Sequence, residues 1–137
     1  MSVWDYFEDI NVITIENSKR LPRLIENLKK SYFNMDKVNI LVEKKKFFGE
    51  NTAEECSLSK VIFDIDETCC NDVCKDIGNR HYKIIKNAYE NNKNNVMIFE
   101  DDAKFIDNID KNKLLSCINF LKNNDWDLFY FGYMSFP

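Results

Sequence analysis

The chain alternates between short apolar runs and longer segments in which apolar residues recur at helical spacing. Apolar runs bounded by polar segments are typical of strands buried in a sheet. The stretch Lys44–Lys60 is polar and charged, which predicts a loop. The predicted strands are Ile10–Ile15, Val38–Glu43, Val61–Ile65, Val96–Glu100 and Asp127–Tyr133.

Other segments have the spacing of helices with one apolar face. The first begins after Ser18, which we predict to be its N-cap, and the second runs from about Arg80 to Asn91. Asp110 is predicted to cap a third helix. The apolar stripes are Leu21, Leu24, Ile25 and Leu28; His81, Ile84, Ile85, Ala88 and Tyr89; and Leu114, Leu115, Ile118 and Leu121.

This order of strands and helices predicts an α/β sandwich with a mainly parallel sheet. In such sheets ligands bind beyond the carboxyl ends of the strands. Glu16 directly follows the first strand, and the triplet Glu100, Asp101 and Asp102 ends the run that begins at Val96. We therefore expect a binding site at this edge. The chain has only three glycines, which excludes the common Gly-rich phosphate loops.

Composition narrows the class of protein. The 137 residues are 45% hydrophobic and 14% aromatic, which predicts one packed domain over residues 1–137. A net charge of −4 argues against a broad nucleic-acid surface. The sequence has no pattern of a signal peptide or membrane span, so we expect a cytoplasmic protein with its five cysteines reduced. Its many asparagines and lysines are consistent with an AT-rich genome, such as that of a large virus.

The acidic triplet has two interpretations. Hard divalent cations such as Mg²⁺ and Mn²⁺ bind one or two carboxylates and fill their other positions with water and substrate phosphates. Alternatively, the acids belong to an ordinary turn in which negative charge precedes a helix. The triplet alone does not distinguish these interpretations.

A longer sequence pattern favours the first interpretation, a site for a divalent cation. The segment "HYKIIKNAYENNKNNVMIFEDDAKF", followed by "NDWDLFYFGY", resembles the core of glycosyltransferase family 25, the lipopolysaccharide and collagen galactosyltransferase group. "VITIENSKRLPRLIENL" is similar to the opening of that family. The resemblance implies a GT-A-like, Rossmann-type three-layer sandwich. It also implies that the chain corresponds to the nucleotide-sugar-binding half, truncated before the acceptor half.

The resemblance also implies site residues. Asp102 matches the metal ligand, with Glu100 as a second metal ligand or a ribose contact, and Asp101 facing the ribose or the waters on the metal. Arg20 and Glu16 would contact the nucleotide or its phosphates, and His81 matches a histidine at the start of a helix. Asp127 and Gly132 match the later strand, where we expect structural roles.

The expected reaction is transfer of a hexose, galactose or glucose, from a UDP-sugar to an acceptor hydroxyl with Mn²⁺ or Mg²⁺ as cofactor. The acceptor would be a glycan, a lipid-linked group or a protein. The family resemblance implies inversion by direct attack of the acceptor oxygen. The sequence does not identify a catalytic base.

Two alternatives remain open. "VIFDIDET" resembles the first motif of haloacid dehalogenase-like phosphatases, with Asp64 as nucleophile, Asp66 as acid/base and Mg²⁺ as cofactor. The gap between Asp64 and Asp101 holds one predicted helix, which is too little for the later motifs of that superfamily. The other alternative is a catalytically inactive α/β binding module with surface acids.

Overall fold

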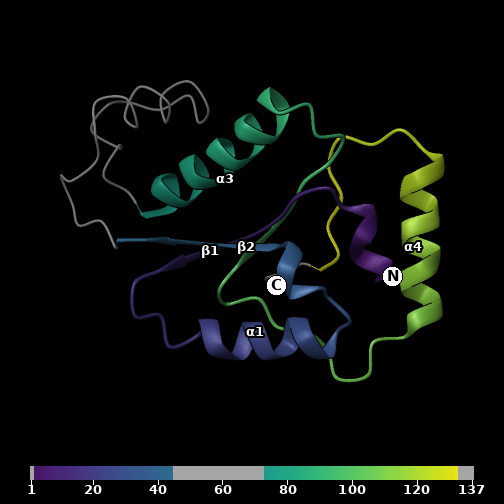
Figure 1. Cartoon of the computed structure of the whole chain (residues 1–137), viewed down its shortest axis with the longest axis horizontal. Helices are drawn as coiled ribbons and strands as arrows, with labels where there is room; N and C mark the ends of the chain where they lie inside the picture. Colours follow the sequence, from purple (N-terminus) through teal and green to yellow (C-terminus); the bar gives the residue numbers. More distant parts are fainter. Residues whose placement is uncertain (1, 45–72, 133–137) are drawn as a thin grey trace, which may run out of the picture. The chain divides into compact units, whose positions relative to one another are not determined.

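The computed structural model describes residues 2–44 and 73–132, with the side chains of residues 73–75 excepted. The chain divides into two compact units, Met1–Phe105 and Ile106–Pro137. The second unit contains α4 (Lys111–Asn123). The elements of the first unit, shown in Figure 1, are η1 (Val3–Tyr6), β1 (Ile10–Ile15), α1 (Leu21–Lys30), η2 (Met35–Lys37), β2 (Val38–Glu43), α3 (Val73–Glu90) and β3 (Met97–Glu100).

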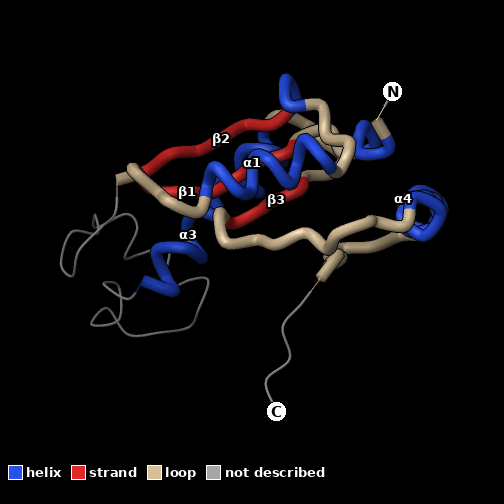
Figure 2. Tube along the Cα trace, turned by 90° about the horizontal axis from the view of Figure 1, so that it is seen from below, coloured by secondary structure: helices blue, strands red, loops and turns tan. Residues whose placement is uncertain are grey.

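The first unit is built on a parallel sheet. Its described strands lie in the order β2-β1-β3, and β1 pairs in parallel with both neighbours. Helix α1 lies against one face and α3 against the opposite face, as Figures 1 and 2 show from two directions. The predicted α/β class with a parallel sheet is confirmed for these residues, and so are the predicted bounds Ile10–Ile15 and Val38–Glu43.

The burial of the strands follows from their positions. Strand β1 lies between two strands and two helices, so its side chains on both faces are buried from Ile10 to Thr14. On one side of the sheet, Val12 pairs with Phe99 of β3, whose ring contacts Phe33 after α1. Strand β2 is an edge strand among the described residues, and the side chain of Val42 is 54% exposed.

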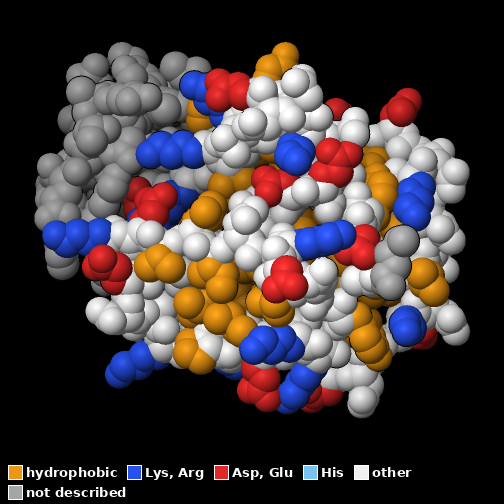
Figure 3. Space-filling view, in the orientation of Figure 1, with side chains coloured by type: hydrophobic (Ala, Val, Ile, Leu, Met, Phe, Trp, Pro, Cys, Tyr) orange, Lys and Arg blue, Asp and Glu red, His pale blue; other side chains and the backbone are white. Residues whose placement is uncertain are grey.

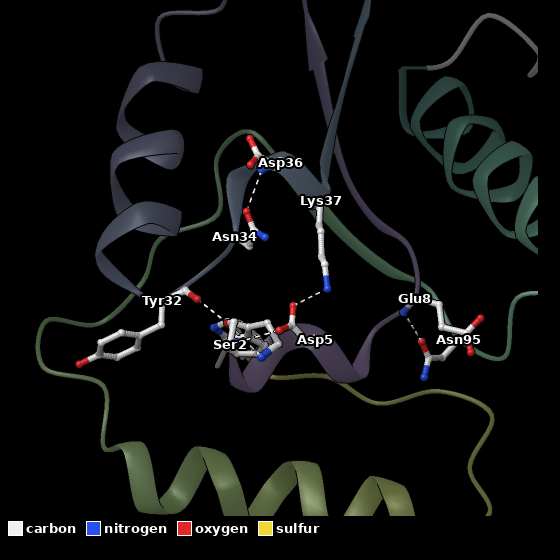
Figure 4. Close-up of polar contacts among 9 residues, drawn as sticks. Ser2, Asp5, Glu8, Tyr32, Asn34, Asp36, Lys37 and Asn95 are labelled. Atoms are coloured by element: carbon white, nitrogen blue, oxygen red, sulfur yellow. Dashed lines mark hydrogen bonds and ion pairs between the residues drawn. The ribbon is translucent and has the colours of Figure 1, made fainter.

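Polar contacts fasten the amino-terminal side of the sheet (Figure 4). Ser2 and Asp5 form a capping box on η1, and Lys37 Nζ lies 2.8 Å from Asp5 Oδ1. The Ser2 hydroxyl donates to the Tyr32 carbonyl, which joins η1 to the end of α1. Trp4 is buried beside them and donates from Nε1 to the Ser31 carbonyl at 2.7 Å. These contacts fix the chain opposite the predicted binding edge.

Helix α3 begins earlier than the sequence predicts. The predicted start was Arg80, but the helix begins at Val73, so His81 lies inside it rather than opening it. The reason is that Asp76, Asn79 and Arg80 are buried polar residues. Because hydrophobic periodicity marks buried positions only when they are apolar, the first two turns of the helix had no visible stripe.

The cap predicted for α1 is also wrong. Helix α1 begins at Leu21 with Pro22 in its first turn, a position that proline favours because its missing N–H is not needed there. Arg20 occupies the N-cap position without a side-chain capping bond. Ser18 lies one turn earlier, and its hydroxyl bonds elsewhere, as described below.

The second unit confirms one prediction and corrects another. Asp110 caps α4, accepting hydrogen bonds from the backbone N–H of Asn112 and Lys113. The predicted strand at Asp127–Tyr133 is not formed over its described residues, 127–132. A strand exists only when it pairs with another, and the described part of this unit contains no other strand. The aromatic residues gave strand propensity without a pairing partner.

The surface charges and the helices of the described residues can be compared with the expectation of a protein without a nucleic-acid surface or a membrane span. On the face drawn in Figure 3, basic and acidic side chains are interspersed rather than gathered by sign. No helix within residues 2–44 and 73–132 has the length and apolar character needed to cross a membrane. Cys117 has a free thiol.

Candidate functional site

The order of the strands marks one place at the carboxyl edge of the sheet. After β1 the chain continues to β2 on one side of it and later returns to β3 on its other side. The order of the described strands therefore reverses at β1. Ligands of open parallel sheets bind at such a reversal, beyond the carboxyl ends of the two diverging strands. Glu16 and Arg20 follow β1, and Asp101 and Asp102 follow β3, which ends at Glu100. The predicted site residues therefore come from the two loops that border this switch point.

Asp101 is the centre of a hydrogen-bonded cluster. It is 4% exposed, and its Oδ2 accepts from the Thr14 hydroxyl at 2.8 Å and from the Ser18 hydroxyl at 2.6 Å. Its Oδ1 lies 2.9 Å from Nη2 of Arg20. Burying a carboxylate is costly unless it is paired and hydrogen-bonded, and Asp101 meets both conditions, with hydrogen bonds at Oδ2 and an ion pair at Oδ1. The cluster ties the loop after β1 to the end of β3.

Glu100 is paired with the helix above the sheet. His81 Nε2 lies 2.9 Å from Glu100 Oε1, joining α3 to the end of β3. This hydrogen bond lowers the pKa of Glu100 below its ordinary value, and partial burial opposes the effect. Asp101 nearby raises the pKa of Glu100, and Arg20 lowers it. Both partners of this pair lie in the family-like segment that begins at His81.

The remaining predicted residues are exposed. The backbone N–H of Glu16 donates to the Glu43 carbonyl at 3.0 Å, which extends the β1–β2 ladder by one residue. The side chains of Glu16 and Asp102 both face solvent. The structure thus joins Arg20 to Asp101 and His81 to Glu100, and it leaves the carboxylates of Glu16 and Asp102 accessible.

Arg80 belongs to this edge but was not predicted. It is 6% exposed, with Nη2 at 2.8 Å from Asp76 Oδ2 and Nε at 3.2 Å from Glu43 Oε2. Its Nη1 also donates to the Thr14 carbonyl at 3.5 Å. Arg80 therefore connects α3 to the carboxyl ends of β1 and β2. The only sequence signal for it was the acid–arginine spacing of four residues on one helix.

Thr14 and Ser18 were also missed as site residues. Thr14 is buried in β1 and reads as an ordinary strand residue, while Ser18 was interpreted as a helix cap. Their hydrogen bonds to Asp101 span 87 and 83 residues of sequence. A local sequence pattern does not predict which hydroxyl group a carboxylate more than 80 residues away will accept a hydrogen bond from.

The side chains at this edge could hold only a metal ion that takes few of its ligands from the protein. Among the described residues, no group of three or more His, Cys, Asp and Glu side chains is arranged to hold a metal ion. A Mg²⁺ or Mn²⁺ ion that takes most of its ligands from a diphosphate and water needs only one or two carboxylates. The exposed Asp102 fits that requirement, and Glu100 precedes it by two residues. Asp101 fits poorly because its oxygens already have three partners within the chain.

A groove of about 370 Å³ lies elsewhere on the first unit. It is bordered by α3 and by the face of β1 and β2 that α3 covers, and only Glu43 and Arg80 connect it with the carboxyl edge. Its other lining residues are Asp9, Asn11, Ile13, Asn39, Leu41, Lys83, Ile84 and Asn87. The switch point is favoured over this groove as the site because the predicted binding residues gather there.

Other predictions fall outside the described residues. They are the strand Val61–Ile65, most of the loop Lys44–Lys60, and the phosphatase-like motif with Asp64 and Asp66. Comparisons of the chain with protein-family models, with characterised proteins and with solved structures each give no match.

Proposed function

We propose that the unit Met1–Phe105 is a GT-A-like, Rossmann-type domain that binds a UDP-sugar, and that the protein is a metal-dependent glycosyltransferase similar to family 25. The proposed reaction transfers galactose or glucose to an acceptor hydroxyl. The domain would supply the donor half of the site, with Arg20, Glu16, Glu100 and Asp102 around the nucleotide and its diphosphate.

One observation carries the proposal. The family-like pattern has a histidine at the start of a helix and, nineteen residues later, an acid at the end of a strand. The matching residues of this chain, His81 inside α3 and Glu100 at the end of β3, are in contact at the switch point. If the sequence match were a coincidence, there would be no reason for two residues nineteen positions apart to be in contact at the edge where parallel sheets bind ligands. Arg20, the third element of the pattern, lies in the same cluster through Asp101.

The roles of the residues follow from their charge and exposure. Arg20 keeps more than half of its side chain exposed, so its guanidinium is free to donate to phosphate oxygens. Asp102 would hold the metal, and Glu100, two residues earlier, would be a second ligand. When bound, a divalent cation stabilises the charge that develops on the diphosphate as the sugar leaves. The acceptor oxygen would attack directly, and no described residue is assigned as its base.

Titration calorimetry tests the proposal. UDP-galactose and UDP-glucose are titrated into the full chain with and without Mn²⁺, and we expect binding heat that depends on the metal. Asp102→Asn should weaken binding by roughly tenfold or more, since it removes a charged metal ligand. Asp107→Asn is the matched control, because Asp107 is another exposed aspartate, outside the proposed donor unit.

The alternatives give different results in the same preparation. If neither sugar nucleotide produces heat above the blank, the glycosyltransferase proposal is wrong. Hydrolysis of a generic phosphomonoester that is lost in Asp64→Asn would support the phosphatase instead. A chain that binds neither ligand and whose melting temperature does not respond to Mn²⁺ or Mg²⁺ would be a binding module.

A further inference from the structure

We propose that Asp101 is a positioning residue that holds Arg20 in place as an anion-binding arm, rather than a ligand of the metal or the nucleotide. The inference rests on the proposed function for the identity of the sugar nucleotide. The claim that the switch point binds a phosphate-type anion does not depend on the proposed function. The inference also changes the role that the sequence predicted for the middle acid of the triplet.

The contacts form a closed ring around Arg20. The Ser18 hydroxyl donates to Asp101 Oδ2 at 2.6 Å and accepts from the backbone N–H of Arg20 at 3.3 Å. Asp101 Oδ1 pairs with the other end of the same residue, Nη2 of the guanidinium. Arg20 is therefore held at its backbone by Ser18 and at its tip by Asp101. An arginine on a surface loop normally samples many rotamers, and these contacts restrict it.

Asp101 is also held in place by residues other than Ser18 and Arg20. The Thr14 hydroxyl donates to its Oδ2 at 2.8 Å, and Thr14 lies in the central strand. Arg80 in turn donates to the Thr14 carbonyl, which connects this strand end to α3. The support of the arm thus extends from the loop into the rigid sheet. A guanidinium fixed in this way loses less freedom when it binds an anion.

Burial separates Asp101 from the ligand-binding acids. A metal ion or a ribose hydroxyl must reach a carboxylate oxygen, and Asp101 is 4% exposed. Arg20 has the opposite arrangement, since 55% of its side chain is exposed. It has five N–H donors, and its Nη2 lies 2.9 Å from Asp101 Oδ1. A guanidinium on a side chain with this exposure can donate further hydrogen bonds to phosphate oxygens.

The sign of one substitution distinguishes the three roles that Asp101 could have. Inorganic pyrophosphate is titrated into the full chain without metal, in wild type and in Asp101→Asn. If Asp101 were only a nearby negative charge, its neutralisation would strengthen anion binding. If it were a metal ligand, its neutralisation would weaken binding only when Mn²⁺ is present. As a positioning residue, Asp101→Asn should weaken metal-free binding by about fivefold to tenfold, because the ion pair that holds Arg20 is lost.

A second set of variants guards against a misfolded Asp101→Asn. Arg20→Gln changes an exposed side chain and should weaken pyrophosphate binding to a similar extent. In the Arg20→Gln background, Asp101→Asn should cause no further loss, since Asp101 would act only through Arg20. Ser18→Ala keeps the charge of Asp101 and should weaken binding by about twofold to threefold, because the hydrogen bonds of the Ser18 hydroxyl to Asp101 and to the Arg20 backbone are removed while the Arg20–Asp101 ion pair stays. Asp107→Asn again serves as the control.

Specific outcomes would overturn the inference. These are a wild type that does not bind pyrophosphate, tighter or unchanged metal-free binding in a folded Asp101→Asn, or an additional loss in the double variant. The proposed function fails separately. If wild type binds pyrophosphate but neither UDP-sugar, the glycosyltransferase is excluded and the positioning role of Asp101 stands.

Discussion

His81 and Glu100 are joined by a hydrogen bond of 2.9 Å that connects the middle of α3 to the last residue of β3. The bond lowers the pKa of Glu100 from its ordinary value of 4.5, so the unfolded chain takes up this proton more readily than the folded chain. The stabilising effect is therefore complete above pH 4.5 and is lost as the pH falls through the lower, folded pKa.

We predict that Glu100→Gln reduces the loss of stability that occurs as the pH falls below 4.5. Because both side chains are partly exposed, the contribution should stay below about 1 kcal/mol. The free energy of unfolding is measured by urea titration at several pH values in wild type and variant. Glu90→Gln is the control on a more exposed carboxylate of α3. Parallel pH curves for wild type and Glu100→Gln would contradict the prediction.

Arg80 should be essential to the stability of the first unit. Replacing it with glutamine breaks the buried ion pair with Asp76, and breaking such a pair typically costs about 3–5 kcal/mol. Lys86→Gln is a matched control on the same helix, because Lys86 forms an exposed i,i+4 pair with Glu90 that is worth only about 0.3–0.5 kcal/mol. Denaturation of the two variants under the same conditions measures the difference, and equal losses would show that burial does not matter here.

Tyr32 has an unfavourable backbone conformation after α1. Its φ is +71°, in the left-handed region that favours glycine, and the N–H of Phe33 bonds back to the Leu28 carbonyl at 3.1 Å. We predict that Tyr32→Gly stabilises the chain by up to about 1 kcal/mol, since it removes the conformational cost. Tyr32→Val should destabilise it. Thermal melts of the three proteins check the order, which is reversed if the tyrosine ring contributes more than its backbone costs.

Trp4 fastens the start of the chain to the end of α1. It stacks on Phe33 with ring centroids 4.3 Å apart and donates to the buried Ser31 carbonyl. Trp4→Phe should keep the stacking but lose the hydrogen bond, at a cost of about 1–3 kcal/mol. Trp4→Ala should lose about 3–5 kcal/mol. Urea denaturation, followed by circular dichroism, separates the two variants. Equal effects would mean that the indole N–H contributes little.

The sequence predicts the parts of the fold that depend on local apolar patterns. The bounds of β1 and β2 were correct because, apart from one asparagine in each strand and the final Glu43, both are made of apolar or β-branched residues between polar segments. The start of α3 was missed because Asp76 and Arg80 are buried polar residues, and a hydrophobic stripe cannot report them. The strand expected at 127–132 failed because propensity does not supply a pairing partner.

The site was predictable in place but not in detail. Topology locates acids at the carboxyl ends of strands, so Glu100 and Asp101 could be assigned to one edge from the sequence. The side chains that they contact could not be assigned, since a carboxylate does not encode whether a hydroxyl, an arginine or a histidine lies opposite. Only the fold shows that neighbouring acids have different partners, His81 for Glu100 and Arg20 for Asp101.

The parallel pairing of β1 with β3 also sets the order in which the molecule assembles. Ile10 pairs with Met97, and the Thr14–Asp101 bond spans the same 87 residues, so neither can form until most of the chain has been synthesised. Loop closure over such a distance must precede the contacts that stabilise it, which slows folding. The central strand is therefore left with one sheet neighbour until a late step. The same step adds the third described strand and brings together the residues of the proposed anion site, so a newly made chain gains its fold and its proposed binding capacity together.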